Sequence, residues 1–510
     1  MAALQSRIFR AAAPVVWLCV LACRREAVAV AAPSPDIPVF IISIDTLRSD
    51  HLPAYGYVHG STPAIDRFRK DALLFRKAFS NVPLTLPSHC SMMTGLLPYT
   101  HGVRDNLGYA LPVERRTLAT LLKEKGYETG AAVSSFVLRS DSGISRGFDT
   151  WDDLMTVSTL ESISSWQRDG DVSRQVLERW LASTHSHKVF GFLHLYEPHK
   201  PYRPPQPFAS KLQNPYDGEI AYADSIVGLF LDSLRSKGLY DGALIIILSD
   251  HGEGLGDHGE SEHGVFLYRE SIQIPLIVKL PRQARAGQED SAVSSIVDIL
   301  PTVLGRLGLS APPGVEGIDL FSEAATRPAD RMVYSETYYP RLHYGWHELM
   351  SLAGAEFHFI EAPRAELYDY VADREERRNL AQEQRRILAS ARTQIQAIAA
   401  AHPFESPKIT DPEVVAKLSA LGYLGSGPAT LSGALPDPKD KLDLLELRGT
   451  GTGYLQSAQY EKAIEIGKKI VASNPDFLPG WGLMSSGYEK LGRRELALDA
   501  LEEQMRRSPG

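Results

Sequence analysis

Four near-continuous apolar runs constrain the fold of this chain more than any other feature. They are VFIISID (39–45), KVFGFLHLY (188–196), ALIIILSD (243–250) and IPLIVKL (274–280). Strands with this composition are buried on both faces, and they belong to parallel sheets covered by helices. Longer helical patterns separate the runs. We therefore predict an α/β domain from residue 37, with a doubly wound, mainly parallel sheet and helices on both faces.

Polar side chains follow the first three of these runs. Asp45 ends the first run, Glu197 and His199 come directly after the second, and Asp250 with His251 follows the third. In open α/β sheets the ligand site lies beyond the carboxyl ends of the strands. We therefore expect these side chains to meet at one rim of the sheet.

The C-terminal segment repeats itself at a fixed period. Pairs of like residues lie 34 positions apart: Gly453 and Gly487, Tyr454 and Tyr488, Ala463 and Ala497, Pro475 and Pro509. This is the period of the tetratricopeptide repeat, a helix-turn-helix unit. We predict a small all-α unit of two such repeats at 442–510, after a linker at 401–441. The repeats suggest a protein or glycan partner. Two ordinary amphipathic helical hairpins are the alternative.

The N-terminus resembles a secretion signal. Arg7 and Arg10 precede the apolar stretch AAAPVVWLCVLAC, which is too short to span a bilayer. Its end, VLAC, resembles a bacterial lipobox in which Cys23 would carry a lipid; cleavage of a plain signal and an uncleaved anchor are the alternatives. We expect residues 1–36 to be the leader and linker of an exported protein of the bacterial periplasm or cell envelope. This leader is the only membrane attachment that we expect.

The charge and the cysteine content narrow the functional classes. The formal net charge is −8 and no long basic run occurs, so nothing in the sequence favours nucleic acid as a partner. The three cysteines are Cys19, Cys23 and Cys90, and the first two belong to the leader. Cys90 would then have no partner, so we expect no disulfide framework in the mature protein.

Seven segments in a fixed order resemble one enzyme family. They are ISIDTLRSDHLPAYGY, STPAIDRF, TLPSHCSMMTGLLPYTHGV, PHKPY, LSDHGEGLGDHG, SIVDILPTVL and ELYDYVADREERRNLA. Through them residues 37 to about 385 resemble the sulfatase branch of the alkaline phosphatase superfamily. The resemblance implies a catalytic domain at 37–400, with one or two divalent metal ions at a doubly wound sheet. It also implies that a metal-bound residue attacks a phosphate or sulfate ester.

Three residues provide ligands for such an ion. Asp45, Asp250 and His251 offer carboxylate oxygen and imidazole nitrogen, which suit zinc or manganese. Sulfatases usually carry a second acid where this chain has Thr46, and the missing carboxylate weakens a calcium site. We favour zinc or manganese over calcium or magnesium for this reason. The alternative for Asp45 is the N-cap of a following helix.

Thr85 occupies the position of the family nucleophile, and we expect it to be a metal ligand as well. Sulfatases convert a cysteine or serine there to formylglycine, and threonine cannot form that aldehyde hydrate because its β-carbon carries a methyl. His89 also replaces the arginine of the C-x-P-S-R signal, and Cys90 is followed by neither the proline nor the arginine. A threonine alkoxide is the nucleophile of the phosphodiesterase-like and phosphotransferase members of the superfamily. The alternative is a catalytically inactive homologue.

Asn106 is a second candidate catalytic residue. It lies 21 positions after Thr85 (106 minus 85). Some superfamily phosphodiesterases place an asparagine at this distance, where it hydrogen bonds a non-bridging oxygen and stabilises charge in the transition state. An Asx turn is the alternative.

The remaining candidates come from two histidine-bearing segments. His199 corresponds to the histidine that contacts the ester in sulfatases, and we expect it to act as the acid for the leaving group. His263 falls where sulfatases carry a lysine. With Glu197 and His199 it could instead complete a second metal site, so a one-metal and a two-metal version both stay open. His194 of the same segment is a further candidate, and packing within its strand is the alternative.

These residues lead to one main hypothesis and two alternatives. The main hypothesis is a metal-dependent ester hydrolase that acts on phosphate, with sulfate as the other ester, through a covalent intermediate on Thr85. The first alternative is transfer of a phospho-headgroup to an acceptor in the cell envelope. The second is a non-catalytic scaffold that recognises an anion and binds a partner through its repeats.

Overall fold

The computed structural model describes residues 33–155, 167–322, 328–404 and 434–507. The predicted leader with Cys19 and Cys23, Pro509 and most of the predicted linker lie outside these residues, so the expectations about them stay predictions. Within the described part of the chain, Cys90 is a buried free cysteine. None of the described helices is both long enough and apolar enough to cross a bilayer.

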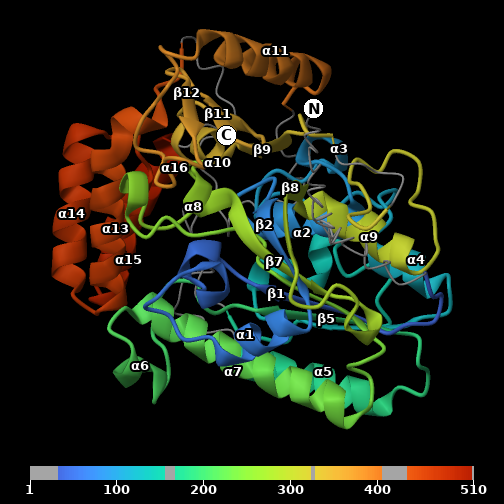
Figure 1. Cartoon of the computed structure of the whole chain (residues 1–510). Coiled ribbons are helices and arrows are strands. Elements are labelled where there is room, and N and C mark those ends of the chain that lie inside the picture. Colours follow the sequence, from blue (N-terminus) through green and yellow to red (C-terminus); the bar gives the residue numbers. More distant parts are fainter. Residues whose placement is uncertain (1–32, 156–166, 323–327, 405–433, 508–510) are drawn as a thin grey trace, which may run out of the picture.

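The core of the fold is an eight-stranded sheet with the strand order β4-β3-β5-β1-β6-β7-β2-β8 (Figure 1). The strands are β1 (Val39–Ile44), β2 (Leu73–Phe79), β3 (Glu128–Ala132), β4 (Thr150–Asp152), β5 (Val189–Leu195), β6 (Leu244–Leu248), β7 (Gln273–Lys279) and β8 (Glu289–Ser295). Neighbouring strands are parallel except where β7 runs against β6 and β2. The sheet is therefore mainly parallel, as predicted, and the fourth apolar run forms its reversed strand.

Helices connect and cover these strands. They are α1 (Pro63–Lys70), α2 (Thr85–Thr94), α3 (Pro98–His101), α4 (Leu118–Lys123), α5 (Gly170–Ser183), α6 (Phe208–Lys211), α7 (Pro215–Ser236), α8 (Arg269–Ile272) and α9 (Ile299–Arg306). In Figure 1, α5 and α7 run along the bottom of the view, and α2, α4 and α9 lie on the other side of the sheet.

Strand β1 shows why the apolar runs are continuous. Its residues Val39 and Ile41 join one apolar cluster with side chains of α2, α4 and α9, whereas Phe40 and Ile42 join another with side chains of α1, α5 and α7. Alternate residues of a strand point to opposite faces. A strand that is covered on both faces must therefore be apolar at every position.

A second, smaller sheet extends the catalytic domain. It is antiparallel, with the order β12-β11-β10-β9. Its strands are β9 (Val333–Thr337), β10 (Leu349–Ala353), β11 (Phe357–Glu361) and β12 (Glu366–Asp369), and two helices accompany them, α10 (Tyr339–Tyr344) and α11 (Arg385–Ala401). Helix α11 packs on β10 and β11.

The C-terminal unit consists of two consecutive helical hairpins. A short 3-10 helix, η9 (Pro438–Lys441), leads into α13 (Leu442–Gln456), α14 (Tyr460–Ser473), α15 (Pro479–Lys490) and α16 (Arg494–Arg507). Successive helices pack on one another, and α13 also packs on α15. An apolar cluster joins the unit to the catalytic domain; in it Phe477 stacks on Trp346, with ring centroids 5.5 Å apart. The unit is therefore docked on the catalytic domain, beside α8 in Figure 1.

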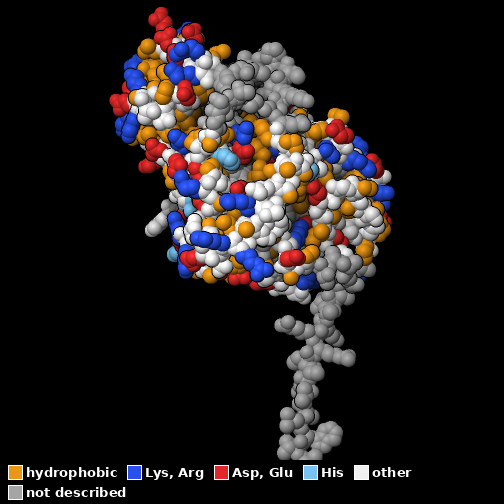
Figure 2. All heavy atoms as spheres, turned by 90° about the horizontal axis from the view of Figure 1, so that it is seen from above, with side chains coloured by type: hydrophobic (Ala, Val, Ile, Leu, Met, Phe, Trp, Pro, Cys, Tyr) orange, Lys and Arg blue, Asp and Glu red, His pale blue; other side chains and the backbone are white. Residues whose placement is uncertain are grey.

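The surface agrees with the modest net charge. On the face that Figure 2 shows, acidic and basic side chains are interspersed over both the catalytic domain and the helical unit.

Candidate active site

Three buried side chains meet where β1 and β6 end. Asp45 comes directly after β1, and Asp250 with His251 lies just beyond β6, which pairs with β1 in parallel. Both carboxylate oxygens of Asp45 and Oδ2 of Asp250 are buried and have no hydrogen-bond partner among the described residues. Burial of unpaired anionic oxygens is costly unless a cation binds them. The predicted rim is thus present, and the only ion-pair partners of these oxygens among the described residues are histidines, at 3.5–3.6 Å.

His251 is oriented with its lone pair toward these carboxylates. Its Nδ1 donates to the carbonyl oxygen of Gly252 at 2.9 Å, so Nε2 is the nitrogen left to accept. Nε2 lies 3.6 Å from Oδ1 of Asp45 and 3.5 Å from Oδ2 of Asp250. A metal-binding histidine usually donates its other N–H to a carbonyl or carboxylate in this way. Burial lowers the pKa of His251 to about 4, which keeps the imidazole neutral.

The donor atoms fit a divalent cation. In a tetrahedral zinc site, ligand atoms lie about 3.4 Å apart when the bonds to the metal are about 2.1 Å long. The separations from Nε2 of His251 match that spacing, and Asp45, Asp250 and His251 form one of the residue groups that could hold an ion. Burial, and then the Asp250 carboxylate, raise the pKa of Asp45 well above its usual value. A bound cation would remove both effects.

Thr46 is held in a strained conformation beside this centre. Its φ is 54°, which a β-branched residue rarely adopts. The carbonyl oxygen of Thr46 accepts from Tyr216 Oη at 2.6 Å, and the amide donates to Oδ1 of Asp250 at 3.3 Å. Strain of this kind persists only where surrounding contacts enforce it, and it is common at functional sites.

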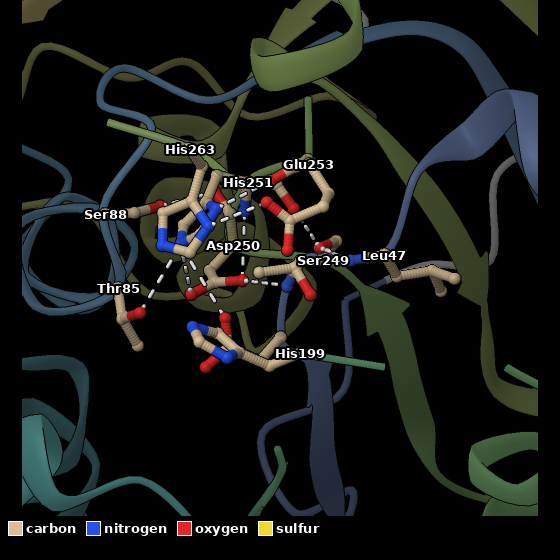
Figure 3. A network of polar contacts seen from close by, with 12 residues as sticks. Leu47, Thr85, Ser88, His199, Ser249, Asp250, His251, Glu253 and His263 are labelled. Carbon is tan, nitrogen blue, oxygen red and sulfur yellow. Dashed lines mark hydrogen bonds and ion pairs between the residues drawn. The ribbon is translucent and has the colours of Figure 1, made fainter. Parts of the chain in front are cut away.

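Thr85 begins α2 and lies against His251. Its Oγ1 is 3.3 Å from Nε2 of His251, and the residue is 3% exposed. Ser88, one turn further along the helix, donates to the carbonyl oxygen of Asp250 at 2.7 Å and fixes α2 on this loop. The structure therefore brings the predicted nucleophile to the predicted ligands (Figure 3).

His89 holds the helical turn that begins with Thr85, and the sequence analysis did not predict this role. Its Nδ1 donates to the carbonyl oxygen of Thr85 at 2.7 Å, and its Nε2 accepts from Oγ of Ser43 at 2.9 Å. Both ring nitrogens are thus engaged. The helical spacing of His89, four residues after Thr85, is the sequence signal that would have placed it there.

His194 is the other histidine whose place differs from expectation. It lies on β5, and its Nε2 is 3.6 Å from Oδ2 of Asp45, while its Nδ1 accepts from the Ser134 amide at 3.3 Å. Of the two interpretations left open for it, site residue or packing residue, the structure places it beside a candidate ligand. The residues His89, His194 and Asp250 form a second group that could hold an ion.

Asn106 lies beside the nucleophile segment. Its Oδ1 accepts from the amide of Leu86, the residue after Thr85, at 2.8 Å. The amide group of Asn106 is therefore held in place through its oxygen. Its NH₂ is the end that can donate to a substrate oxygen.

A buried carboxylate that the sequence analysis missed, Glu253, organises the second half of the site. Its Oε1 accepts from Nδ1 of His263 at 3.0 Å, and its Oε2 accepts from the Tyr202 hydroxyl at 3.0 Å. Burial raises the pKa of Glu253 to about 7. The His263 ring lies over that of His251, with centroids 4.5 Å apart, as Figure 3 shows.

His199 lies on the other side of His263. The two ring centroids are 5.1 Å apart, and Nδ1 of His199 donates to the carbonyl oxygen of Lys200 at 2.7 Å. Nε2 of His199 is therefore the nitrogen available for proton exchange. Burial lowers the pKa of His199 to about 4.

Glu197 does not join these histidines. Its Oε1 accepts from the Gly170 amide at the start of α5 at 3.0 Å, and its Oε2 is buried with no hydrogen-bond partner in the described chain. Among the described residues, the groups that could hold an ion do not include Glu197, His199 or His263. The described residues therefore do not gather the three side chains of the two-metal version into one such group, and the one-metal and two-metal versions both stay predictions. Glu253, which directly follows the DHG of the metal segment, bonds His263 where the two-metal version places Glu197.

The fold and this centre define an α/β protein with a candidate metal site at the carboxyl ends of its strands. The sequence profile described as "Sulfatase" matches residues 38–309, more than half of the chain, and that of "N-sulphoglucosamine sulphohydrolase, C-terminal" matches residues 256–400. The chain belongs to the sulfatase family, and the predicted class, a hydrolase of ester bonds, is confirmed.

Two relatives are named as sulfatases as well. The chain is 27% identical to the ulvan-active sulfatase of Formosa agariphila, over 58% of this chain and 66% of the relative. It is 24% identical to the Δ4,5-hexuronate-2-O-sulfatase of Bacteroides thetaiotaomicron, over 71% of this chain and 89% of that protein.

Among solved structures, the phosphonate monoester hydrolase of Agrobacterium radiobacter matches with a TM-score of 0.61 at 20% identity, over 72% of this chain and 96% of that one. The 2-O glycosaminoglycan sulfatase BT1596 matches with a TM-score of 0.59 at 20% identity, over 75% of this chain and 96% of that one. At 20% sequence identity, both matches support the fold and nothing further.

Proposed function

We propose that the protein is a metal-dependent hydrolase of phosphate esters that uses Thr85 as its nucleophile. The observation that carries the proposal is the 3.3 Å separation of Thr85 Oγ1 from His251 Nε2, in a buried centre whose carboxylate oxygens have no partner in the described chain. Thr85 is the first residue of α2, where the helix dipole favours negative charge. The helix N-terminus favours an ionised hydroxyl, and a cation bound by the unpaired carboxylates would favour it further.

We assign the metal to Asp45, Thr85, Asp250 and His251, and the mixed oxygen and nitrogen donors favour zinc or manganese. A bound cation would supply Lewis acidity to the ester and lower the pKa of the Thr85 hydroxyl. The bond from Oγ1 to phosphorus forms while the bond from phosphorus to the leaving oxygen breaks, and water later cleaves the phosphothreonine.

The other residues hold charge and move protons. The Asn106 NH₂ donates to a non-bridging oxygen of the ester, since its Oδ1 is engaged by the Leu86 amide. Nε2 of His199 is the unprotonated nitrogen, since its Nδ1 donates to the Lys200 carbonyl; it takes the proton that the Thr85 hydroxyl loses, passes it to the leaving oxygen, and later takes one from the attacking water and returns it to Thr85 Oγ1. His263 is oriented for the same work by Glu253.

Sulfate esters are the second candidate substrate. The named relatives are sulfatases, which favours sulfate. Thr85 favours phosphate, because threonine cannot become formylglycine. With sulfate the same attack would form a sulfothreonine, which only attack at sulfur could cleave.

The test uses three aryl esters that share one leaving group: a phosphate monoester, a phosphate diester and a sulfate. Each is assayed with zinc, manganese or calcium on the wild type, on Thr85→Ala, and on Thr393→Ala, which removes a hydroxyl bonded to its own helix on α11. Metal-dependent phosphoester turnover that is lost only in Thr85→Ala supports the proposal. Turnover of sulfate alone, or turnover that survives in Thr85→Ala, contradicts it.

We also propose that the helical unit consists of two tetratricopeptide repeats and that the protein is exported. The repeat assignment is supported by the register of the period: Gly453 and Gly487 fall in the first helices, α13 and α15, and Ala463 and Ala497 fall in the second helices, α14 and α16. Export rests on the leader sequence alone. Cleavage mapping of the mature N-terminus tests it.

A further inference from the structure

Helix α13 of the C-terminal unit lies along the loop that carries His263. Leu442 of this helix lies so close to Gly259 that a β-carbon at residue 259 would be 2.8 Å from the leucine side chain. Gly449 of the helix lies against Ser261. At the far end of α13, the carbonyl oxygen of Gln456 accepts from Arg203, which lies just after the His199 segment, at 3.1 Å. One helix of the C-terminal unit thus contacts both histidine-bearing loops.

The central contact of this interface is an ionic triad, Lys200–Glu262–Arg448. Nζ of Lys200 is 2.9 Å from Oε1 of Glu262, and Nη2 of Arg448 is 3.3 Å from Oε2. Burial alone would raise the pKa of Glu262, but Arg448 and Lys200 outweigh it and lower that pKa. The carboxylate is therefore ionised, and one anion lies between two cations.

The triad is next to the reacting groups. Lys200 directly follows His199 and Glu262 directly precedes His263, whose rings are 5.1 Å apart. The side chains of Lys200, Glu262 and Arg448 are 20%, 24% and 27% exposed, so each still reaches the surface. With one carboxylate and two cations, the triad carries a net positive charge of one. It adjoins His199 and His263, with the Glu253 carboxylate on the far side bonded to His263.

We propose that this triad is a subsite for a second anionic group of the substrate, a carboxylate, sulfate or phosphate that lies beyond the ester that is cleaved. The C-terminal unit is then part of the active site, because Arg448 comes from α13. The Lys200 ammonium donates to Oε1 of Glu262 and has three N–H groups in all, so a second anion can accept from another of them. Arginine adds a planar donor fork suited to such groups. This inference rests on the proposed function for its catalytic consequence.

The experiment compares two aryl esters with the same scissile ester and leaving group. One carries a carboxymethyl arm on the ring, and the other carries the methyl ester of that arm. Turnover is measured for the wild type and Arg448→Gln. Binding of both compounds is measured by calorimetry on full-length Thr85→Ala, with and without Arg448→Gln. The matched control is Arg493→Gln, which removes the same charge from an exposed ion pair on the helical unit.

We expect the carboxylate compound to bind and react about 10-fold better than its methyl ester, and Arg448→Gln to reduce this preference to below about 2-fold. Arg493→Gln should leave it unchanged. No preference in the parent protein, or a preference that survives Arg448→Gln, overturns the subsite. An equal loss for both compounds also overturns it, since Arg448 would then only position the loop. Failure of the proposed function appears differently, as a wild type that binds but does not turn over.

Discussion

The two halves of the site differ in how their polar atoms are used. At the strand ends, the oxygens of Asp45 and Oδ2 of Asp250 have no hydrogen-bond partner in the described chain. In the loops that carry His199 and His263, Glu253 has both oxygens bonded and Glu262 has an ion pair on each. Bare, buried oxygens that lie together, as those of Asp45 and Asp250 do, indicate a ligand that the described residues do not supply, whereas paired ones indicate side chains held in orientation. We therefore assign the metal to the first half and substrate contacts to the second.

The largest effect is expected at Thr85. Thr85→Ala removes the only hydroxyl that lies against His251 Nε2 in the described site, and we expect kcat/KM for the preferred ester to fall at least about 10³-fold. Thr85→Ser keeps the hydroxyl and should retain activity within about 10-fold. Steady-state kinetics with zinc or manganese measures both. Equal activity of Thr85→Ala and wild type would contradict the assignment of the first half.

Metal removal tests whether the unpaired oxygens of Asp45 and Asp250 bind an ion. Chelation should abolish activity, and added zinc or manganese should raise the melting temperature of the wild type. In metal-free protein, burial and the nearby Asp250 carboxylate disfavour a negative charge on Asp45. Asp45→Asn removes this charge, so we expect it to raise the free energy of unfolding by about 1–3 kcal/mol. The same variant should lose the stabilisation by metal. Thermal unfolding with and without metal gives both values. If Asp45→Asn destabilises the metal-free protein, the Asp45 oxygens must have hydrogen-bond partners in the folded state.

Much of this arrangement could be predicted from the sequence, for physical reasons. The apolar runs must be covered on both faces, so they specify a sheet between helix layers, and parallel strands bring Asp45 and Asp250 to one rim. The reversal of β7 could not be foreseen, because a central strand reads as apolar in either direction. The second sheet was also missed, since its strands have only four or five residues.

The site was predictable only where the chain is locally regular. Thr85 and Asp250 stand at fixed offsets from a helix start and a strand end, so their meeting follows from the topology. Glu197 and Glu253 lie in loops whose path depends on tertiary contacts. Both are acids close to a histidine, and nothing in the sequence distinguishes the one that turns back to His263 from the one bonded to α5. For His194 the sequence left two interpretations, because a strand residue can pack or bind with the same pattern.

In the half of the site that contains His199 and His263, we expect a smaller catalytic effect, at Glu253. Glu253→Ala removes the acceptor that orients His263, and we expect kcat/KM to fall about 10–100-fold. Glu253→Gln keeps an acceptor oxygen for Nδ1 and should stay within about 5-fold of the wild type. A loss as large in Glu253→Gln as in Glu253→Ala would mean that the charge of Glu253 matters more than its hydrogen bond. The pH–rate profiles of the two variants separate these cases.

The smallest effect concerns the stability of the docked helical unit. Because Arg448 and Lys200 lower the pKa of Glu262 below its usual 4.5, the folded state binds fewer protons there than the unfolded state as the pH falls. Its contribution is therefore fully present above about pH 4.5 and is lost on acidification. Glu262→Gln should cost about 1 kcal/mol at pH 7, and the difference from the wild type should shrink between pH 5 and pH 4. The control Glu461→Gln breaks an exposed pair with Arg493 at 3.5 Å and should change little at any pH. Denaturant unfolding across this range decides the matter, since a difference that stays constant down to pH 4 would show that Glu262 acts through packing and not through its charge.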